Sequence, residues 1–222
     1  MNTPSRTPSR RRVLILLAAS GVVLTGCADS TSPGTTPAAE ELAGGTVPLS
    51  APAVVDGNQA LQRLVEGNAR FVADREERLD EGIARRVAVS EGQHPFATVL
   101  GCVDSRVPIE LVFDQGLGNL VVVRSAGEAL DRSVTGGVEF GVAELRTPLL
   151  MVLGHQRCGA LDATIKALES QQRTAHAGEL GYIVDTLAPA VRQVAGKPGD
   201  RLTNAIHANV ALVLAAVDVR LA

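Results

Sequence analysis

Three short apolar runs alternate with helical patterns along the central part of the chain. They cover residues 97–102, 120–124 and 149–154, and apolar side chains continue through each run rather than alternating with polar ones. Such runs are typical of strands that are buried on both faces. Because helical segments separate the runs, the strands must pair in parallel. We therefore predict an α/β fold, a parallel sheet flanked by helices.

Apolar residues spaced three and four apart predict the helices. The first begins at Asp56 or Asn58, either of which can cap it, and ends near Arg75. A polar loop is expected from there to Gln93. The remaining helices are expected from residue 107 onward and over residues 132–145, 159–170, 180–195 and 201 to the last residue.

The N-terminal segment has the pattern of an export signal. Arg10, Arg11 and Arg12 precede an apolar run over residues 13–24, which is short for a membrane span but typical of a signal-peptide core. The run ends in Leu-Thr-Gly-Cys, which resembles the lipobox of bacterial lipoproteins, so we expect Cys27 to carry a lipid anchor. The alternative is an uncleaved helix with a chance cysteine.

These features divide the chain into three parts. Residues 1–27 are predicted to be a signal peptide with a lipobox, exported by the twin-arginine or the general secretory route. Residues 28–56 are rich in Ser, Thr, Pro, Gly and Ala and are predicted to form a flexible tether. Residues 57–222 form the folded domain. We expect a protein anchored to the outer face of the cell membrane or held in the periplasm.

Composition and charge exclude nucleic acid as a partner. The net charge of −3 provides no basic surface, and the aromatic content of 2%, with no Trp, provides no platform on which bases could stack. A hydrophobic fraction of 45% with 20% charged residues is typical of a globular domain. The core is expected to consist of aliphatic side chains.

Two cysteines and a histidine follow the predicted strands. Cys102 closes the first run, and His155 follows the third run with Cys158 three positions later, where a helix begins. Ligands gather at the carboxyl ends of parallel strands, so these side chains can converge. Two thiolates and one imidazole are a known catalytic zinc set with an open fourth position. Small buried cysteines, a core histidine or a Cys102–Cys158 disulfide are the alternatives.

The residues around these three side chains resemble a known family. Residues 102–106 read C-x-D-S-R and residues 154–159 read G-H-x-x-C-G, which together resemble the β-class carbonic anhydrases. The likeness extends from the helix at Asn58 to Asn209-Val210. It implies a β-carbonic-anhydrase-like zinc domain that converts carbon dioxide reversibly to bicarbonate and a proton, using a zinc-bound hydroxide and one zinc ion per chain.

The resemblance also implies roles for individual residues. Cys102, His155 and Cys158 match the zinc ligands of the family. Asp104 and Arg106 match its catalytic dyad, in which the guanidinium holds the carboxylate so that it orients the hydroxide. In a closed state, Asp104 would instead become the fourth zinc ligand. An ion pair that caps the following helix is the structural alternative for Asp104 and Arg106, and both roles can hold together.

Other positions are near the expected site. The resemblance places Gln93 and Gly159 in the vicinity of the substrate, and Arg124 and Gly127 also match family positions. Ser125, Glu128 and Asn119 differ from the residues usual there. No metal is assigned to the remaining histidines, His94, His176 and His207.

The C-terminal part of the chain departs from the family pattern. After Asn209-Val210 the family continues into a further parallel strand beside the third strand and an edge strand that pairs subunits, whereas this sequence stops at Ala222. We expect the last strands to be missing and the third strand to have an exposed edge. The homodimer or larger assembly typical of the family is then in question. The alternative function is a truncated, catalytically silent zinc-binding or disulfide-bonded lipoprotein, and a related substrate such as carbon disulfide also remains open.

Overall fold

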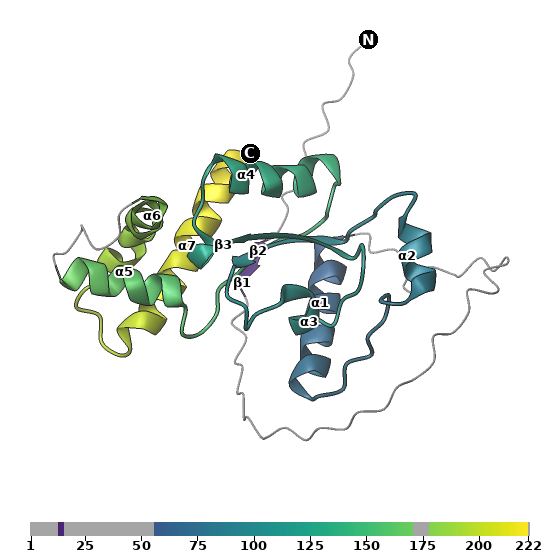
Figure 1. The fold of residues 1–222 in the computed structure, drawn as a ribbon, viewed down its shortest axis with the longest axis horizontal. Helices are drawn as coiled ribbons and strands as arrows, with labels where there is room; N and C mark the ends of the chain where they lie inside the picture. The colour runs from purple at the N-terminus through teal and green to yellow at the C-terminus, as the bar shows by residue number, and fades with distance from the viewer. Residues whose placement is uncertain (1–12, 16–55, 171–177, 222) are drawn as a thin grey trace, which may run out of the picture.

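A parallel sheet forms the centre of the molecule. The computed structural model describes residues 13–15, 56–170 and 178–221 (Figure 1). Within these residues, the sheet has four strands in the order β1-β4-β2-β3, all parallel. The strands are β1 (Val13–Ile15), β2 (Ala97–Cys102), β3 (Leu120–Ser125) and β4 (Leu150–Leu153). The predicted α/β fold with a parallel sheet is confirmed.

Strands β2, β3 and β4 match the three apolar runs closely. Every residue of β2 and β4 is buried, while β3 at the edge is half-buried throughout. Cys102 pairs with Ser125 at the end of the β2–β3 ladder, and Gly101 pairs with Leu153 at the end of the β2–β4 ladder. The carboxyl ends of the strands therefore lie level with one another, as a convergent site requires.

The outer edge of β4 is occupied by β1. Val13 lies opposite Leu150, and Ile15 lies opposite Val152. The expectation that this edge is exposed is therefore wrong for the chain described here. An unpaired strand edge presents free N–H and C=O groups, and an extended apolar segment can satisfy them. The sequence pattern assigns this segment to the predicted leader, so cleavage before Cys27 would remove β1 and leave the outer edge of β4 unpaired in the mature chain. Cys27 and residues 28–55 of the predicted tether lie outside the described residues.

Helices cover both faces of the sheet and its carboxyl end. In Figure 1, α1 and α3 lie on one face and α4 lies on the other, while α5 and α6 gather beside one end and α7 runs from that end toward α4. None of the described helices is long and apolar enough to cross a bilayer. The helices are α1 (Gly57–Val72), α2 (Ile83–Val89), α3 (Ile109–Val112), the 3-10 turn η1 (Ala126–Glu128), α4 (Arg132–Glu139), the π-helix η2 (Phe140–Glu144), α5 (Gly159–Glu169), α6 (Glu179–Gln193) and α7 (Arg201–Leu221).

The first helix illustrates how local sequence determines the elements. The Asp56 carboxylate accepts hydrogen bonds from the N–H groups of Asn58 and Gln59, at 2.8 and 2.9 Å, which confirms one of the two predicted caps. By contrast, α2 falls within the predicted polar loop. This helix has apolar residues at Ile83 and Val87, one turn apart, but none of its residues is buried, so it does not contribute to the core.

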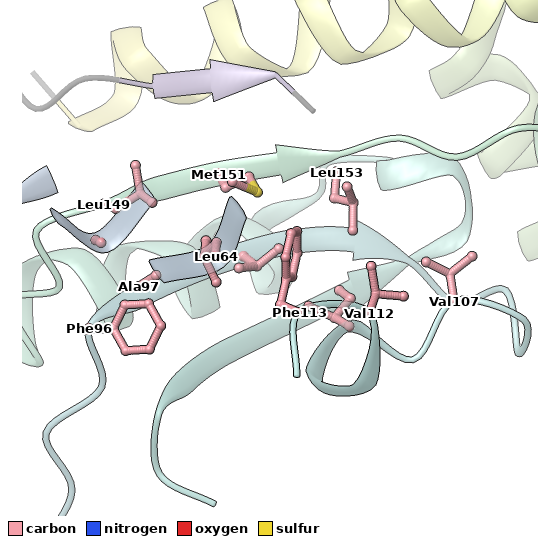
Figure 2. Close-up of a cluster of buried hydrophobic side chains, with 12 residues drawn as sticks. Leu64, Phe96, Ala97, Val107, Val112, Phe113, Leu149, Met151 and Leu153 are labelled. Atoms are coloured by element: carbon pink, nitrogen blue, oxygen red, sulfur yellow. The ribbon is translucent and has the colours of Figure 1, made fainter. Parts of the chain in front are cut away.

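An apolar cluster fills the space between α1, α3 and the sheet. Figure 2 shows Leu64 of α1 and Phe113 beside Met151 and Leu153 of β4. Leu64 and Met151 are fully buried. A second cluster, which includes Val138 and Val213, packs on the opposite face. These clusters fix the positions of β2 and β4, whose carboxyl ends lead into the site.

Candidate metal centre

Three metal-ligating side chains meet at the carboxyl ends of β2 and β4. Cys102 ends β2, His155 follows β4, and Cys158 is the cap residue of α5. One ligand atom from each residue lies within 4.8 Å of the others, and all three residues are buried. The structure thus brings together the three residues that sequence reasoning selected, although 53 positions separate Cys102 from His155.

His155 has one ring nitrogen ready for a ligand. Its Nδ1 lies 3.0 Å from the Gln156 carbonyl oxygen, which fixes the orientation of the ring. Its buried Nε2 has no hydrogen-bond partner among the described residues. A buried polar atom without a partner is costly, and a metal bond removes that cost. The two sulfur atoms and one nitrogen fit zinc, which prefers tetrahedral sulfur and nitrogen ligands.

The two cysteines are free thiols that influence each other strongly. A hydrogen bond from Cys158 lowers the pKa of Cys102 to about 4. The same interaction, together with burial, raises the pKa of Cys158 and outweighs the Leu161 N–H at the start of α5. Because zinc binds cysteine as the thiolate, metal binding at this pair would release protons. Neither cysteine forms the disulfide considered as an alternative.

A carboxylate faces the cluster and is held by an arginine. The Arg106 guanidinium donates to both oxygens of Asp104, at 2.9 and 2.8 Å, and to the Arg157 carbonyl oxygen at 3.0 Å. This interaction lowers the pKa of Asp104 well below its usual range. Asp104 Oδ2 lies 3.9 Å from His155 Nε2. Because the carboxylate is engaged with Arg106, the ligand cluster contains three residues and leaves Asp104 outside it.

His155 also responds to these charges. Burial disfavours its protonated form, but the nearby Cys102 sulfur and the negative charges of Cys102 and Asp104 outweigh burial, so the pKa of His155 is raised. A dication at this position would interact favourably with the same negative groups.

A second arginine holds the main chain at the end of β2. Arg124 Nε donates to the Cys102 carbonyl oxygen, and its Nη2 donates to the Asp104 carbonyl oxygen, both at 2.7 Å. The Val103 N–H continues the ladder by donating to the Ser125 carbonyl oxygen at 3.2 Å. Arg124 therefore fixes the backbone from which both the ligand Cys102 and the carboxylate Asp104 project.

Two buried polar residues near the cluster were not selected from the sequence as site residues. Glu128 and Asn209 are 1% and 3% exposed. Burial, and then the charge of Cys102, raise the pKa of Glu128 to about 8. Asn209 lies 81 positions away and donates to a Glu128 oxygen at 3.2 Å. An acidic residue after a glycine is typical of an exposed turn, so no local signal marks Glu128 as buried.

The other selected residues lie apart from the cluster or beside it. Gln93 is exposed and precedes β2, whereas Cys102 ends that strand, so the structure does not bring Gln93 to the cluster within one chain. Gly159 is the first residue of α5, next to Cys158. His94 and His207 are exposed, and His176 lies outside the described residues.

Comparisons with known proteins identify relatives of this arrangement. The profile of the carbonic anhydrase family matches residues 97–221, which include the three clustered residues. Carbonic anhydrase of Mycolicibacterium smegmatis is 44% identical over 132 residues, 60% of this chain and 63% of that protein. Carbonic anhydrase 2 of Mycobacterium tuberculosis is 38% identical over 160 residues, 70% of this chain and 76% of that protein. The match to the first of these relatives thus spans somewhat less than two thirds of its length.

Solved structures show the same fold. The β-carbonic anhydrase CcaA superposes with a TM-score of 0.53 at 26% identity, covering 73% of this chain and 74% of that one. The β-carbonic anhydrase CafA of Aspergillus fumigatus gives a TM-score of 0.52 at 23% identity, covering 72% and 74%. The sheet and its covering helices are therefore an arrangement known from these enzymes.

Proposed function

Because the chain belongs to the β-class carbonic anhydrase family, we propose that it catalyses the reversible hydration of carbon dioxide to bicarbonate and a proton. The observation that carries the proposal is the buried cluster of Cys102, His155 and Cys158, with a histidine nitrogen that has no hydrogen-bond partner among the described residues. These residues would hold about one zinc ion per chain. When bound, zinc would supply a Lewis acid that makes a water molecule acidic enough to react near neutral pH.

Asp104 and Arg106 would orient the reacting water. Because its pKa is lowered by Arg106, the Asp104 carboxylate is ionised at neutral pH and can only accept hydrogen bonds. A water hydrogen that points at this carboxylate leaves a lone pair on the water oxygen directed elsewhere, toward the carbon of carbon dioxide. The two-point contact with Arg106 would also restrain the carboxylate from taking the open ligand position. Its alternative role as the fourth ligand would need this contact to break.

Zinc content and stopped-flow hydration of carbon dioxide on the full chain test the proposal. We expect about one zinc per chain and rapid hydration that falls strongly in Asp104→Ala while zinc remains. Asp162→Ala is the matched control, because Asp162 forms a surface pair with Lys166 on α5. A zinc-loaded protein without hydration would contradict the enzymatic proposal, and a carbon disulfide assay on the same sample would then test the related substrate.

We also propose that the chain is exported and anchored to a membrane through a lipid on Cys27. Support comes from the sequence alone, namely the lipobox-like residues that end the apolar run over residues 13–24. Cys27→Ser should abolish incorporation of labelled fatty acid in cells and release the protein from the membrane fraction. Replacing Arg10, Arg11 and Arg12 by Lys would block export by the twin-arginine route and leave general secretion unaffected. Unchanged membrane association in Cys27→Ser would contradict the anchor.

The assembly of the chain is a separate proposal. A homodimer or larger assembly is expected from the family resemblance. Size-exclusion chromatography with light scattering on the zinc-loaded full chain would measure it directly. A stable monomer with full hydration activity would show that assembly is not needed for the reaction.

A further inference from the structure

The turn η1 connects the metal cluster to α7. The Gly127 N–H donates to Cys102 Sγ at 3.2 Å. The carbonyl oxygen of the same residue accepts a hydrogen bond from Asn209 Nδ2 at 2.8 Å. Asn209 Nδ2 also lies 3.2 Å from Glu128 Oε2. One amide side chain on α7 therefore holds both the main chain and the side chain of the turn that touches the ligand sulfur.

Two residues of the turn η1 have backbone conformations that most residues adopt only at a cost. Gly127 and Glu128 have φ angles of 61° and 54°, in the left-handed region. Glycine adopts this region freely, but a residue with a Cβ does so at a cost of roughly 1 kcal/mol. A Cβ on Gly127 would come within 2.8 Å of Leu187 Cδ1 of α6. Contacts from α6 and α7 must therefore hold the turn, because its local preference does not.

The contacts from α7 are polar, although the surroundings are apolar. Asn209 and Glu128 are almost fully buried, close to the apolar cluster formed by α5, α6 and α7. Glu128 Oε1 has no hydrogen-bond partner in the described part of the chain. Burying such groups costs stability, so packing alone does not explain them. Together, Asn209 and Glu128 fix the direction of the Gly127 N–H.

We propose that Asn209 and Glu128 are positioning residues that hold the Gly127 N–H on the Cys102 sulfur and thereby tune the metal–thiolate bond. Neither residue needs to touch the metal or the substrate. An N–H donor on a ligand sulfur withdraws electron density from it, and groups that fix such donors affect metal affinity. The inference rests on the proposed zinc site and concerns what controls it.

Asn209→Leu tests the inference, because it removes the amide donor at similar volume. We expect the zinc affinity of the full chain, measured by competition with a chelator, to fall about 10-fold. With Co²⁺ as a probe, the thiolate-to-cobalt charge-transfer band should shift, since the hydrogen bond to Cys102 changes. Asn209→Asp also lacks the N–H donor and should shift the band in the same direction. It replaces Asn209→Leu in the test if the leucine variant does not fold.

Two controls separate positioning from packing. Val213→Ala removes a buried side chain from the same helix, away from the turn, so it should lower stability and leave the cobalt band unchanged. Glu128→Gln keeps an oxygen that can accept from Asn209, so its band should stay close to that of the unmodified chain.

The outcomes distinguish the two proposals. If the unmodified chain binds neither zinc nor Co²⁺, the proposed function fails and this inference fails with it. If the unmodified chain binds both metals but the Asn209 variants fold, bind with unchanged affinity and show an unshifted band, only the inference is overturned. It is likewise overturned if Val213→Ala shifts the band as much as Asn209→Leu, because the effect would then be general loosening of α7.

Discussion

Strands β2 and β4 contribute to two regions of the molecule, an apolar cluster and the metal cluster. The two regions differ in whether their buried polar atoms have hydrogen-bond partners. In the apolar cluster of Figure 2, β2 and β4 contribute side chains such as Val99 and Met151, which pack against α1 and α3. At their carboxyl ends, the same strands lead into Cys102 and His155. Here the buried His155 Nε2 has no hydrogen-bond partner in the described chain.

This difference shows what each region is for. The apolar cluster is explained by burial alone, which is worth about 1.5–3 kcal/mol for each fully buried aliphatic side chain. The metal cluster has free thiols, a histidine nitrogen without a hydrogen-bond partner and a buried carboxyl group, all of which cost stability. Such features persist where they serve a function, so the two regions should respond differently to substitution.

The largest effect is expected from breaking the metal cluster with Cys158→Ser. A hydroxyl is a poor zinc ligand, so we expect metal loss and a fall in hydration of at least about 100-fold. Zinc analysis and stopped-flow assays measure both. Cys27→Ser removes the cysteine of the predicted lipobox, which is not one of the three assigned ligands, and should keep zinc and activity. Full zinc occupancy in Cys158→Ser would contradict the assigned ligand set.

Breaking the apolar cluster should lower stability without loss of zinc. Leu64 is fully buried against the sheet, so Leu64→Ala should lower the free energy of unfolding by about 2–5 kcal/mol. The zinc content of the folded fraction should not change, because the cluster lies on the other side of β2 from the ligands. Denaturant unfolding and zinc analysis on one sample test this. Val65→Ala, at an exposed position of the same helix, is the control.

A smaller effect is expected from Arg106→Lys, which retains the charge and loses the planar two-point contact with Asp104. Zinc should stay bound, while hydration should fall about 10-fold because the carboxylate is less well oriented. Arg157→Lys offers a neighbouring exposed control that contributes only its main-chain oxygen to this arrangement. Unchanged hydration in Arg106→Lys would show that the two-point contact is not needed.

The stability of the metal-free chain should also depend on pH through the buried Glu128. Folding raises its pKa from an ordinary 4.5 to about 8, so the folded state holds this proton more tightly than the unfolded state. The contribution of Glu128 to stability is therefore fully present below about pH 4.5 and is lost as the pH rises through about 8. Unfolding curves of the metal-free chain across this window should show the decline. Glu128→Gln cannot titrate, so a decline of equal size in this variant would refute the assignment.

Much of the fold was predictable because its strands are buried on both faces. The runs at residues 97–102 and 120–124 gave β2 and β3 within one residue, and Asp56 gave the start of α1. The hydrophobic pattern did not predict a helix whose residues are all outside the core, or a strand whose partner is far away in the sequence. Helix α2 has no buried residue, and β1 pairs with β4 from far along the sequence. Periodicity contains no information on the pairing of distant strands, and the apolar residues of α2 span only two turns.

The site was predictable in its ligands and in some of its supports, such as Arg124 and Gly127, but not in Glu128 and Asn209. Cys102, His155 and Cys158 have recognisable side-chain chemistry at the ends of strands, and family motifs surround them. Glu128 and Asn209 are ordinary residue types whose burial depends on α7 packing against a turn some eighty positions earlier. Only the folded structure brings them together.

X-ray absorption at the zinc edge of the purified full chain tests the central claim most directly. We predict two sulfur ligands at about 2.3 Å and two nitrogen or oxygen ligands at about 2.0–2.1 Å, one of them water in the open position. Cys158→Ser should lose this signal. A zinc ion surrounded only by nitrogen and oxygen, or a protein that takes up no zinc, would contradict the account.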